Sequence, residues 1–223
     1  MVRSQQGPLS FSNEHVIQSP AHIKNVIFDL GDVIIDISIP GTIAGFAQRS
    51  GLSNEQVKEI YSSSSIFLDY EKGKISDQEF YMGANSLFGT NMTYEEFCEI
   101  WNGMLLQIPS ERLRLLEKVS GKFRIFLLSN TNDIHLKRFT QMMKEVSPDK
   151  PLQNYFEKAY FSNLMGMRKP DAEIFEFVLK ENNLNPLETL FLDDNAENII
   201  GASRLGIQVT IVKHPDILFE IFP

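Results

Sequence analysis

Residues 25–36 read NVIFDLGDVIID, in which an apolar run, Val26-Ile27-Phe28, stops at Asp29-Leu30-Gly31. A short uninterrupted apolar run is typical of a strand that is covered on both faces, as in a parallel sheet with helices on each side. The acid and the glycine that follow indicate a turn. The stretch therefore predicts a strand of an α/β fold with a carboxylate, Asp29, at its carboxyl end.

The rest of the chain alternates helical and strand patterns in a way that extends this sheet. From about residue 39 to 106 the patterns are helical, and Ser53 and Thr93 begin two of them at capping-box spacing. Further helices are expected at 110–119, after 132, at 171–181 and at 196–204, and strands at 123–128, 159–161, 189–192 and 208–212. This alternation predicts a Rossmann-like parallel sheet with helices on both faces and an inserted helical cap.

The same patterns divide the chain into an arm, a core and a cap. Residues 1–20 carry Gly, Pro, Ser and Asn without periodicity and are expected to form a flexible arm. We expect residues 21–37 and 108–223 to form the core domain and residues 38–107 to form the cap domain. With 223 residues and 43% hydrophobic content, the chain is long enough for one good-sized core and a smaller unit.

Composition restricts the classes of partner. A net charge of −8 argues against a nucleic-acid surface or an anionic membrane as the partner, which favours a small molecule. A single cysteine, Cys98, excludes an intrachain disulfide framework, and no apolar run approaches the length of a membrane span. The first residues contain no signal-peptide core, so we expect a cytoplasmic protein.

Polar residues follow directly after several predicted strands, namely Asp29, Ser129-Asn130 and Asp193-Asp194. Ligands of open α/β sheets bind at the carboxyl ends of the strands, so these side chains are expected to share one crevice. A carboxylate there can attack phosphorus or bind a cation, and a hydroxyl and an amide at a helix N-terminus can hold phosphate oxygens. Lys169 adds positive charge, and the paired acids are hard oxygen ligands suited to Mg²⁺. The set predicts a phosphoryl-transfer site.

Each of these residues also has an ordinary structural interpretation. Ser129-Asn130 can simply cap the next helix, and a lysine before Pro170 is commonly a solvated loop residue. Asp193-Asp194 can be a turn followed by a helix cap. Two adjacent carboxylates after a buried strand repel each other unless a cation or hydrogen-bond donors relieve them, and this favours the metal site.

Four stretches, in order, resemble the motifs of the haloacid dehalogenase-like (HAD) hydrolase superfamily. They are FDLGDV at 28–33, LLSNTN at 127–132, GMRKPDAEIF at 166–175 and FLDDNAENIIGASRLGI at 191–207. The helical insert resembles the four-helix cap of that superfamily, and the likeness extends over residues 24–213. Together with YEKGKISDQEF at 70–80, the wording is similar to the bacterial α-D-glucose-1-phosphate phosphatase type.

The resemblance implies a role for each matching residue. Asp29 is expected to be the nucleophile that forms an aspartyl-phosphate, and also a Mg²⁺ ligand. The other implied metal ligands are the backbone carbonyl of Gly31, Asp194 and, directly or as an outer ligand, Asp193. Ser129 and Asn130 are expected to bind the phosphoryl group of a small phosphorylated metabolite, Lys169 to neutralise its charge, and Asn198 to orient a metal-bound water.

The chain departs from the superfamily pattern at Gly31, where most such phosphatases have an aspartate that protonates the leaving oxygen. General acid catalysis contributes typically 10²–10⁴-fold, so its loss bears on the rate. Either Asp32 serves as the acid, or the substrate has a good leaving group such as the anomeric hydroxyl of a sugar 1-phosphate. The alternative for Asp32 is a loop residue that accepts hydrogen bonds from nearby backbone N–H groups.

Because Gly31 replaces the usual acid, a second hypothesis is a catalytically weak HAD-fold protein that binds a phosphorylated ligand for regulation. Two further classes fit less well. In a phospho-acceptor receiver the acidic pair precedes the phospho-acceptor, and a carbon–halogen hydrolase has no need of the Asp193-Asp194 pair.

The cap sequence supports three smaller predictions. Residues 69–74 are expected to form either a cap loop that faces the site, with Gly73 in a tight turn, or a plain interhelical turn. His135 is expected on the surface of its helix, with the edge of the crevice as the alternative. The predicted interior of the cap consists of Phe80, Leu87, Phe88, Phe97 and Trp101.

Overall fold

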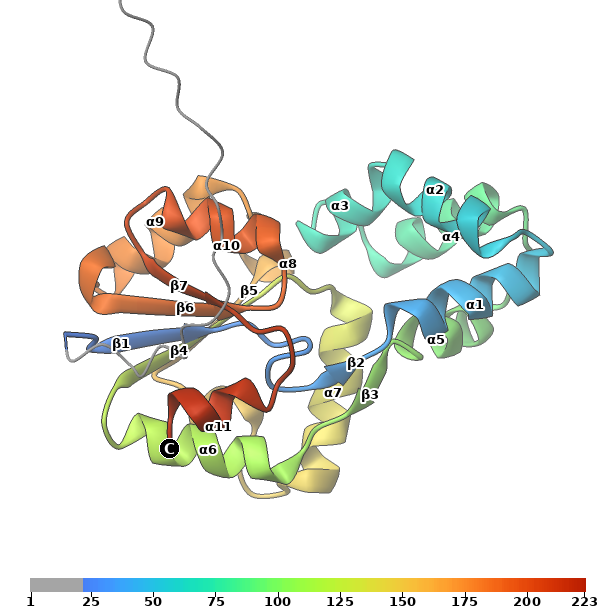
Figure 1. Cartoon of the computed structure of the whole chain (residues 1–223). Helices are drawn as coiled ribbons and strands as arrows, with labels where there is room; N and C mark the ends of the chain where they lie inside the picture. Colours follow the sequence, from blue (N-terminus) through green and yellow to red (C-terminus); the bar gives the residue numbers. More distant parts are fainter. Residues whose placement is uncertain (1–21) are drawn as a thin grey trace, which may run out of the picture.

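A five-stranded parallel sheet lies at the centre of the computed structural model, which describes residues 22–223 (Figure 1). Its strands are β1 (Asn25–Phe28), β4 (Arg124–Ser129), β5 (Lys158–Phe161), β6 (Thr189–Asp193) and β7 (Gln208–Ile211), in the order β5-β4-β1-β6-β7. The chain passes from β1 to β4 and β5 on one side and then continues with β6 and β7 on the other. The strand order therefore reverses beside β1, which is where ligands bind in such sheets. The predicted arm, residues 1–20, lies outside the described residues.

Helices cover both faces of this sheet, as the alternation of patterns predicted. Figure 1 shows α9 (Ala172–Glu181) and α10 (Ala196–Ser203) on one face, and α6 (Ser110–Ser120) and α11 (Ile217–Ile221) on the other. The face with α6 also carries α7 (Asp133–Val146), while α8 (Ser162–Met165) follows β5 directly. Two 3₁₀ turns, Leu152–Tyr155 and Pro186–Glu188, complete the core. No helix among residues 22–223 has both the length and the apolar character needed to cross a membrane.

The central strand is buried on both sides because its side chains alternate between two hydrophobic clusters. Val26 and Phe28 pack into the cluster under α6 and α7, and Ile27 packs into the cluster under α9 and α10. All three side chains have no exposed surface. Alternate residues of a strand point to opposite faces, so an apolar run without polar interruptions is what this position requires.

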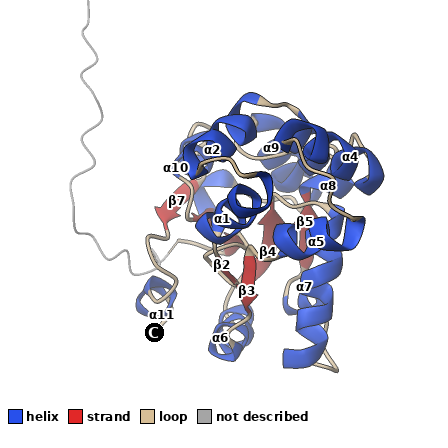
Figure 2. Cartoon of the chain, turned by 90° about the vertical axis from the view of Figure 1, so that its right-hand side faces the viewer, coloured by secondary structure: helices blue, strands red, loops and turns tan. Residues whose placement is uncertain are grey.

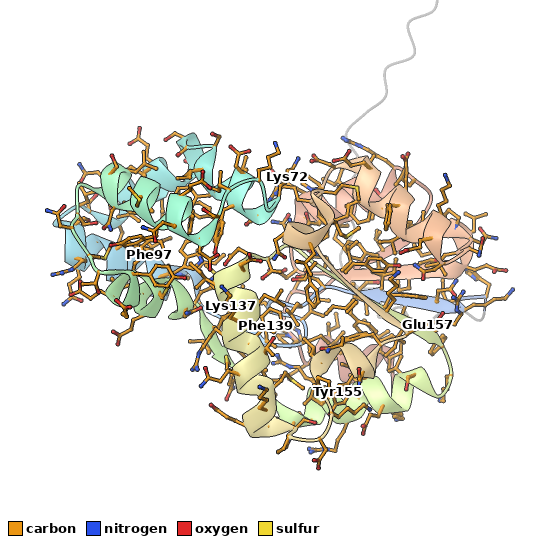
Figure 3. The ribbon with its side chains drawn as sticks, turned by 180° about the vertical axis from the view of Figure 1, so that it is seen from behind. Lys72, Phe97, Lys137, Phe139, Tyr155 and Glu157 are labelled. Atoms are coloured by element: carbon orange, nitrogen blue, oxygen red, sulfur yellow. The ribbon has the colours of Figure 1, made fainter. Side chains whose placement is uncertain are left out.

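The inserted segment forms α1 (Ile39–Ser50), α2 (Asn54–Ser63), α3 (Ile66–Glu71), α4 (Asp77–Phe88) and α5 (Tyr94–Asn102), here called the cap helices. They pack around a hydrophobic cluster of their own, in which Phe97 lies (Figure 3). Both predicted capping boxes are present, at Ser53 and Thr93. The domain boundaries predicted at either side of residues 38–107 stay a prediction.

Two details of the cap differ from the sequence-based expectation. Within the described residues, the cap has five helices in place of the four expected, because residues 66–71 form the short helix α3. The first half of the expected 69–74 loop is therefore helical. Phe67 and Tyr70, three residues apart, are buried in the cap cluster, and this packing holds a helix too short to show a periodic pattern. Leu87 is 40% exposed because the buried stripe of α4 runs through Phe80, Ala84 and Phe88 and leaves Leu87 at its edge.

Two short antiparallel strands, β2 (Asp36–Ile37) and β3 (Leu105–Gln107), connect the cap helices to the core. Figure 2 shows them next to each other below α1. The backbone N–H of Ser38 donates a 2.8 Å hydrogen bond to the carbonyl of Met104. The chain therefore enters and leaves the cap at one place.

Candidate active site

The predicted acids lie together at the carboxyl end of the sheet. Asp29 follows β1 and Asp193 ends β6, the two strands on either side of the reversal in strand order. The backbone N–H of Asp29 donates to the carbonyl of Leu192 at 2.8 Å, which keeps the two strand ends in register. Asp194 follows at the exposed mouth of the site. The parallel sheet thus brings together acids that are 164 and 165 positions apart.

Lys169 is the centre of this site. Its side chain is 1% exposed, and its Nζ lies 2.5 Å from Asp29 Oδ1 and 2.7 Å from Asp193 Oδ2. Burial by itself lowers the pKa of Lys169, but Asp193 and Asp29 outweigh it, so the pKa is raised and the side chain is an ammonium. The solvated loop lysine that the sequence also allowed is therefore excluded.

Asp29 and Asp194 are held in an environment that disfavours negative charge. Burial raises the pKa of Asp29 to about 7, with a further contribution from Asp193 and partial compensation by Lys169. Desolvation, then Asp193 and Asp32, raise the pKa of Asp194 to about 6. One lysine does not balance this concentration of carboxylates, so a bound cation would stabilise their ionised forms.

The acids fit a hard divalent cation. Asp29, Asp193 and Asp194 each offer a carboxylate oxygen, and these oxygens lie within 4.8 Å of one another. Asp193 is already saturated with donors: it accepts from Lys169, from the backbone N–H of Asn195 at 2.8 Å and from Asn198 Nδ2 at 3.0 and 3.1 Å. Asp29 and Asp194 therefore have the freer oxygens, which is the oxygen chemistry that Mg²⁺ prefers.

Ser129 and Asn130, predicted to bind phosphate, have different surroundings. Ser129 is buried at the end of β4, and its hydroxyl makes only a long 3.4 Å hydrogen bond to the carbonyl of Asn130. The side chain of Asn130 bonds to the backbone of Lys169: Nδ2 donates to the carbonyl and Oδ1 accepts from the N–H, both at 2.9 Å. Asn130 thus positions the lysine, and it uses one donor and one acceptor site of its amide for this purpose.

Asp32 sits in a strained turn three residues after Asp29. Its φ of 47° is in the left-handed region, and its Oδ1 accepts a 3.0 Å hydrogen bond from the backbone N–H of Ile37. This hydrogen bond agrees with the interpretation of Asp32 as a loop residue that accepts from a backbone N–H. The other carboxylate oxygen, Oδ2, is not used in this bond. At Gly31 an added Cβ would lie 3.0 Å from Ile37 Cδ1, so any larger residue there requires that side chain to shift.

Two sets of contacts in this region were not predicted from the sequence. Ser162, fully buried, braces the loop after β4: its hydroxyl accepts from the N–H of Thr131 at 2.9 Å and donates to the carbonyl of the same residue at 3.0 Å. Glu71 of α3 accepts a 2.9 Å hydrogen bond from Nε of Arg168, the neighbour of Lys169. Burial raises the pKa of Glu71, and Arg168 and Lys169 oppose that rise.

The cap approaches the core closely at this same loop. Lys72 forms an ion pair with Asp171 at 2.8 Å, and Figure 3 shows Lys72 on the part of the cap that lies nearest to the core. Gly73 has a φ of 62°, and a Cβ on it would lie 2.0 Å from the carbonyl oxygen of Asn163. Only glycine allows this backbone contact. The predicted tight turn at Gly73 is confirmed, and it packs on α8.

A second junction involves α7, and it corrects the prediction that His135 lies on a helix surface. His135 is 6% exposed and stacks on Trp101 of α5, with ring centroids 5.0 Å apart. Its Nε2 lies 2.9 Å from the carbonyl of Trp101, which can only accept, so Nε2 carries the hydrogen. Its Nδ1 faces Nδ2 of Asn132 at 3.1 Å and accepts, because Oδ1 of Asn132 is bonded to the His135 N–H. The first turn of α7 is covered by the cap, which sequence periodicity does not reveal.

Several relatives of this chain are phosphatases. Residues 23–206 match the haloacid dehalogenase-like hydrolase family. The chain is 34% identical over 187 residues to a D-ribitol-5-phosphate phosphatase of Bacteroides thetaiotaomicron, covering 83% of this chain and 90% of that protein. It is 26% identical over 188 residues to a sesquiterpene phosphatase of Aspergillus oryzae, covering 82% and 87%.

A solved structure shows the same fold with ligands. The crystal structure of a HAD family enzyme of Bacteroides thetaiotaomicron in complex with magnesium and inorganic phosphate has a TM-score of 0.74 and 36% identity, covering 85% of this chain and 93% of that one. These matches confirm the predicted class of enzyme, a phosphatase with a Mg²⁺ cofactor. By its family match and its relatives, the chain belongs to the haloacid dehalogenase-like hydrolases.

Proposed function

We propose that this chain hydrolyses the phosphate monoester of a small metabolite, with Asp29 as the nucleophile. The observation that carries the proposal is the buried bridge of Lys169 between Asp29 and Asp193. It fixes a carboxylate and a positive charge at one point of the crevice. A phosphoryl group placed there meets a nucleophile and a charge that stabilises its oxygens in the transition state.

The reaction proceeds in two displacements. The Asp29 carboxylate attacks phosphorus, the bond from phosphorus to the substrate oxygen breaks, and the alcohol leaves with a proton. Water then attacks the aspartyl-phosphate, which releases phosphate and restores the carboxylate. Lys169 stays protonated throughout and compensates charge on the transferred group, while Ser129 offers its hydroxyl to a phosphate oxygen.

Asp29, Asp194 and the carbonyl of Gly31 would hold Mg²⁺, with Asp193 as an outer support of Lys169 and the site. When bound, the ion neutralises the carboxylates and the phosphoryl oxygens. Asn198, which donates to both oxygens of Asp193, orients that acid. Asn130 acts through Lys169.

Protonation of the leaving oxygen is the step for which Gly31 provides no side chain. We assign it to the free oxygen of Asp32, or to water where the leaving alcohol is acidic, as at the anomeric position of a sugar 1-phosphate. An Asp32→Asn variant separates these: a fall of about 10²-fold in kcat assigns the acid to Asp32. Unchanged turnover removes Asp32 from the reaction.

The proposal is tested by phosphate release from a panel of phosphate monoesters with and without Mg²⁺. Release that depends on Mg²⁺ and disappears in Asp29→Asn, but persists in the exposed control Asp149→Asn, is the expected result. Mg²⁺ should also raise the melting temperature of the native protein and not that of an Asp29→Asn/Asp194→Asn double variant. No release from any ester, with Mg²⁺ still bound, would favour the regulatory phosphate-binding role that Gly31 keeps open. We place the reaction in the cytoplasm, as the sequence predicts.

A further inference from the structure

A cavity of about 300 Å³ opens between α1 and α2 of the cap. Its wall is formed mainly by aromatic and aliphatic side chains, among them Ile39, Phe46, Tyr61, Phe67 and Trp101. Thr42, Lys58 and Tyr61 are the lining residues that carry a hydroxyl or an ammonium group. The volume is at the lower end of the range of ligand pockets, about 300–1,000 Å³, and the lining is of the apolar kind that such pockets have.

Two wall residues connect the cavity with the candidate active site. Ile39 lies two residues after Ile37, whose backbone N–H is bonded to Asp32 and whose side chain would touch a Cβ at Gly31. Tyr61 lies within the electrostatic reach of Glu71 and Arg168, the ion pair adjacent to Lys169; burial and then Glu71 raise the pKa of the Tyr61 phenol. The wall at Ile39 is thus two residues away from a side chain that lies against Gly31, in the loop that follows Asp29.

One wall residue has an unmet hydrogen-bonding capacity. Thr42 is 4% exposed, and its Oγ1 has no hydrogen-bond partner. A buried hydroxyl without a partner is uncommon and costs stability. The hydroxyl oxygen is itself buried, so it is not open to the cavity, and the wall is apolar at this point.

We propose that this cavity binds an apolar alkyl or alicyclic group of the substrate, whose phosphate ester lies at Asp29. The inference rests on the proposed phosphatase reaction and specifies its substrate class: monoesters of largely apolar alcohols. A sugar or polyol is disfavoured, because its hydroxyl groups would lose hydrogen bonds to water against a wall in which Lys58 and Tyr61 are the main polar residues. The apolar wall instead gains with each methylene removed from water.

The test compares n-alkyl phosphates from ethyl to octyl with glucose 1-phosphate and ribitol 5-phosphate. In the native protein kcat/KM should rise by about fourfold per added methylene, which corresponds to about 0.8 kcal/mol each, until the cavity is filled. The Ile39→Gln variant should lower the ratio of kcat/KM for octyl over ethyl phosphate. The matched control is Leu106→Gln, because Leu106 is an equally exposed apolar residue that does not line the cavity, and it should retain the native ratio.

Binding without turnover gives an independent readout. Trp101 is the single tryptophan of the chain and lines the cavity, so n-octyl phosphonate should change its emission in Asp29→Asn protein, whereas ethyl phosphonate should change it far less. Release from short esters with no dependence on chain length overturns the apolar subsite and leaves the phosphatase reaction intact. If the native protein turns over none of the esters but the emission change is retained, the reaction is overturned and the subsite is supported. Higher kcat/KM for the sugar and polyol phosphates than for the alkyl phosphates overturns the subsite.

Discussion

Asn130 and Lys169 hold each other through two hydrogen bonds of 2.9 Å, one from the Asn130 side-chain amide to the Lys169 carbonyl and one from the Lys169 N–H to Asn130 Oδ1. The pair joins the loop after β4 to the loop that carries the buried ammonium. A residue predicted to touch phosphate therefore determines where the lysine of the site lies.

We expect Asn130→Asp to lower kcat by about 10–100-fold. The substitution keeps the acceptor for the Lys169 N–H but places a carboxylate oxygen against the Lys169 carbonyl, so the loop shifts and the ammonium is displaced from Asp29. Steady-state kinetics with a saturating substrate check this result. Asn185→Asp, at an N-cap far from the site, serves as the control, and a native kcat in Asn130→Asp would show that the two bonds do not position Lys169.

The Glu71–Arg168 ion pair should stabilise the packing of the cap on the core to a measurable extent. Both side chains are about one-fifth exposed, at 20% and 22%, so water screens the pair less than it screens a surface pair. A double-mutant cycle with Glu71→Gln and Arg168→Gln is expected to give a coupling energy of about 0.5–3 kcal/mol in KM or in unfolding free energy.

The exposed pair Arg124–Glu157, at 43% and 47% exposure, provides the comparison. Its coupling energy in the same experiment should be about 0–1 kcal/mol and should fall with added salt. Equal coupling energies for the two pairs would contradict the idea that the Glu71–Arg168 pair is shielded at the cap–core contact.

His135 should make the protein less stable as the pH falls from about 6.5 to about 4. Burial lowers the pKa of His135 to about 4, below its ordinary value of about 6.5, so in this window the unfolded chain binds the proton and the folded protein does not. Stability is then lost on acidification, by up to about 3 kcal/mol, and is fully present above about pH 6.5.

Urea unfolding of the native protein and of His135→Gln between pH 4 and 8 checks this dependence. The variant should be less stable at pH 8 but should lose less stability on acidification, because carboxylates alone remain to titrate. His214→Gln, at an exposed site, is expected to follow the native curve. Parallel curves for native protein and His135→Gln would mean that burial does not hold the imidazole neutral.

A comparison of Thr42 with Thr189 measures how much an unpaired buried hydroxyl lowers the free energy of unfolding. Both are buried, but Thr189 Oγ1 donates to the Asn185 carbonyl at 2.8 Å, whereas Thr42 Oγ1 has no partner. Thr42→Val should raise the unfolding free energy by about 1 kcal/mol, and Thr189→Val should lower it by about 1–3 kcal/mol, as measured by urea unfolding. Destabilisation by Thr42→Val would show that this hydroxyl is paired in solution.

The parallel core was predictable because its signals are local. The apolar run at Val26-Ile27-Phe28 and the acids that follow the strands identify a sheet and its binding edge, and the family motifs place Asp29 and Lys169 in one site. The short helix α3 carries no comparable signal, because six residues are too few for a period and its stability comes from packing of Phe67 and Tyr70.

Contacts between distant segments set what the sequence left open. Nothing near Asn130 indicates that its amide bonds to a backbone 39 positions away, and nothing near Glu71 indicates Arg168 as its partner. His135 is an example. The hydrophobic pattern of α7 identifies the face of the helix that packs on the sheet. The first turn of α7 also packs on the cap, and the periodicity of α7 alone does not predict that contact.

The closure of the cap segment at Ser38 and Met104 has a consequence for how such a chain can be rebuilt. Because a backbone hydrogen bond joins Ser38 and Met104, the residues next to β2 and β3, the whole helical unit occupies the position of a hairpin loop. Replacing residues 39–103 with a two-residue Asn-Gly turn would leave the strand pair connected in its present register. The insert is thus connected to the core at a single point, and its deletion or exchange there would leave the order of the sheet strands unchanged.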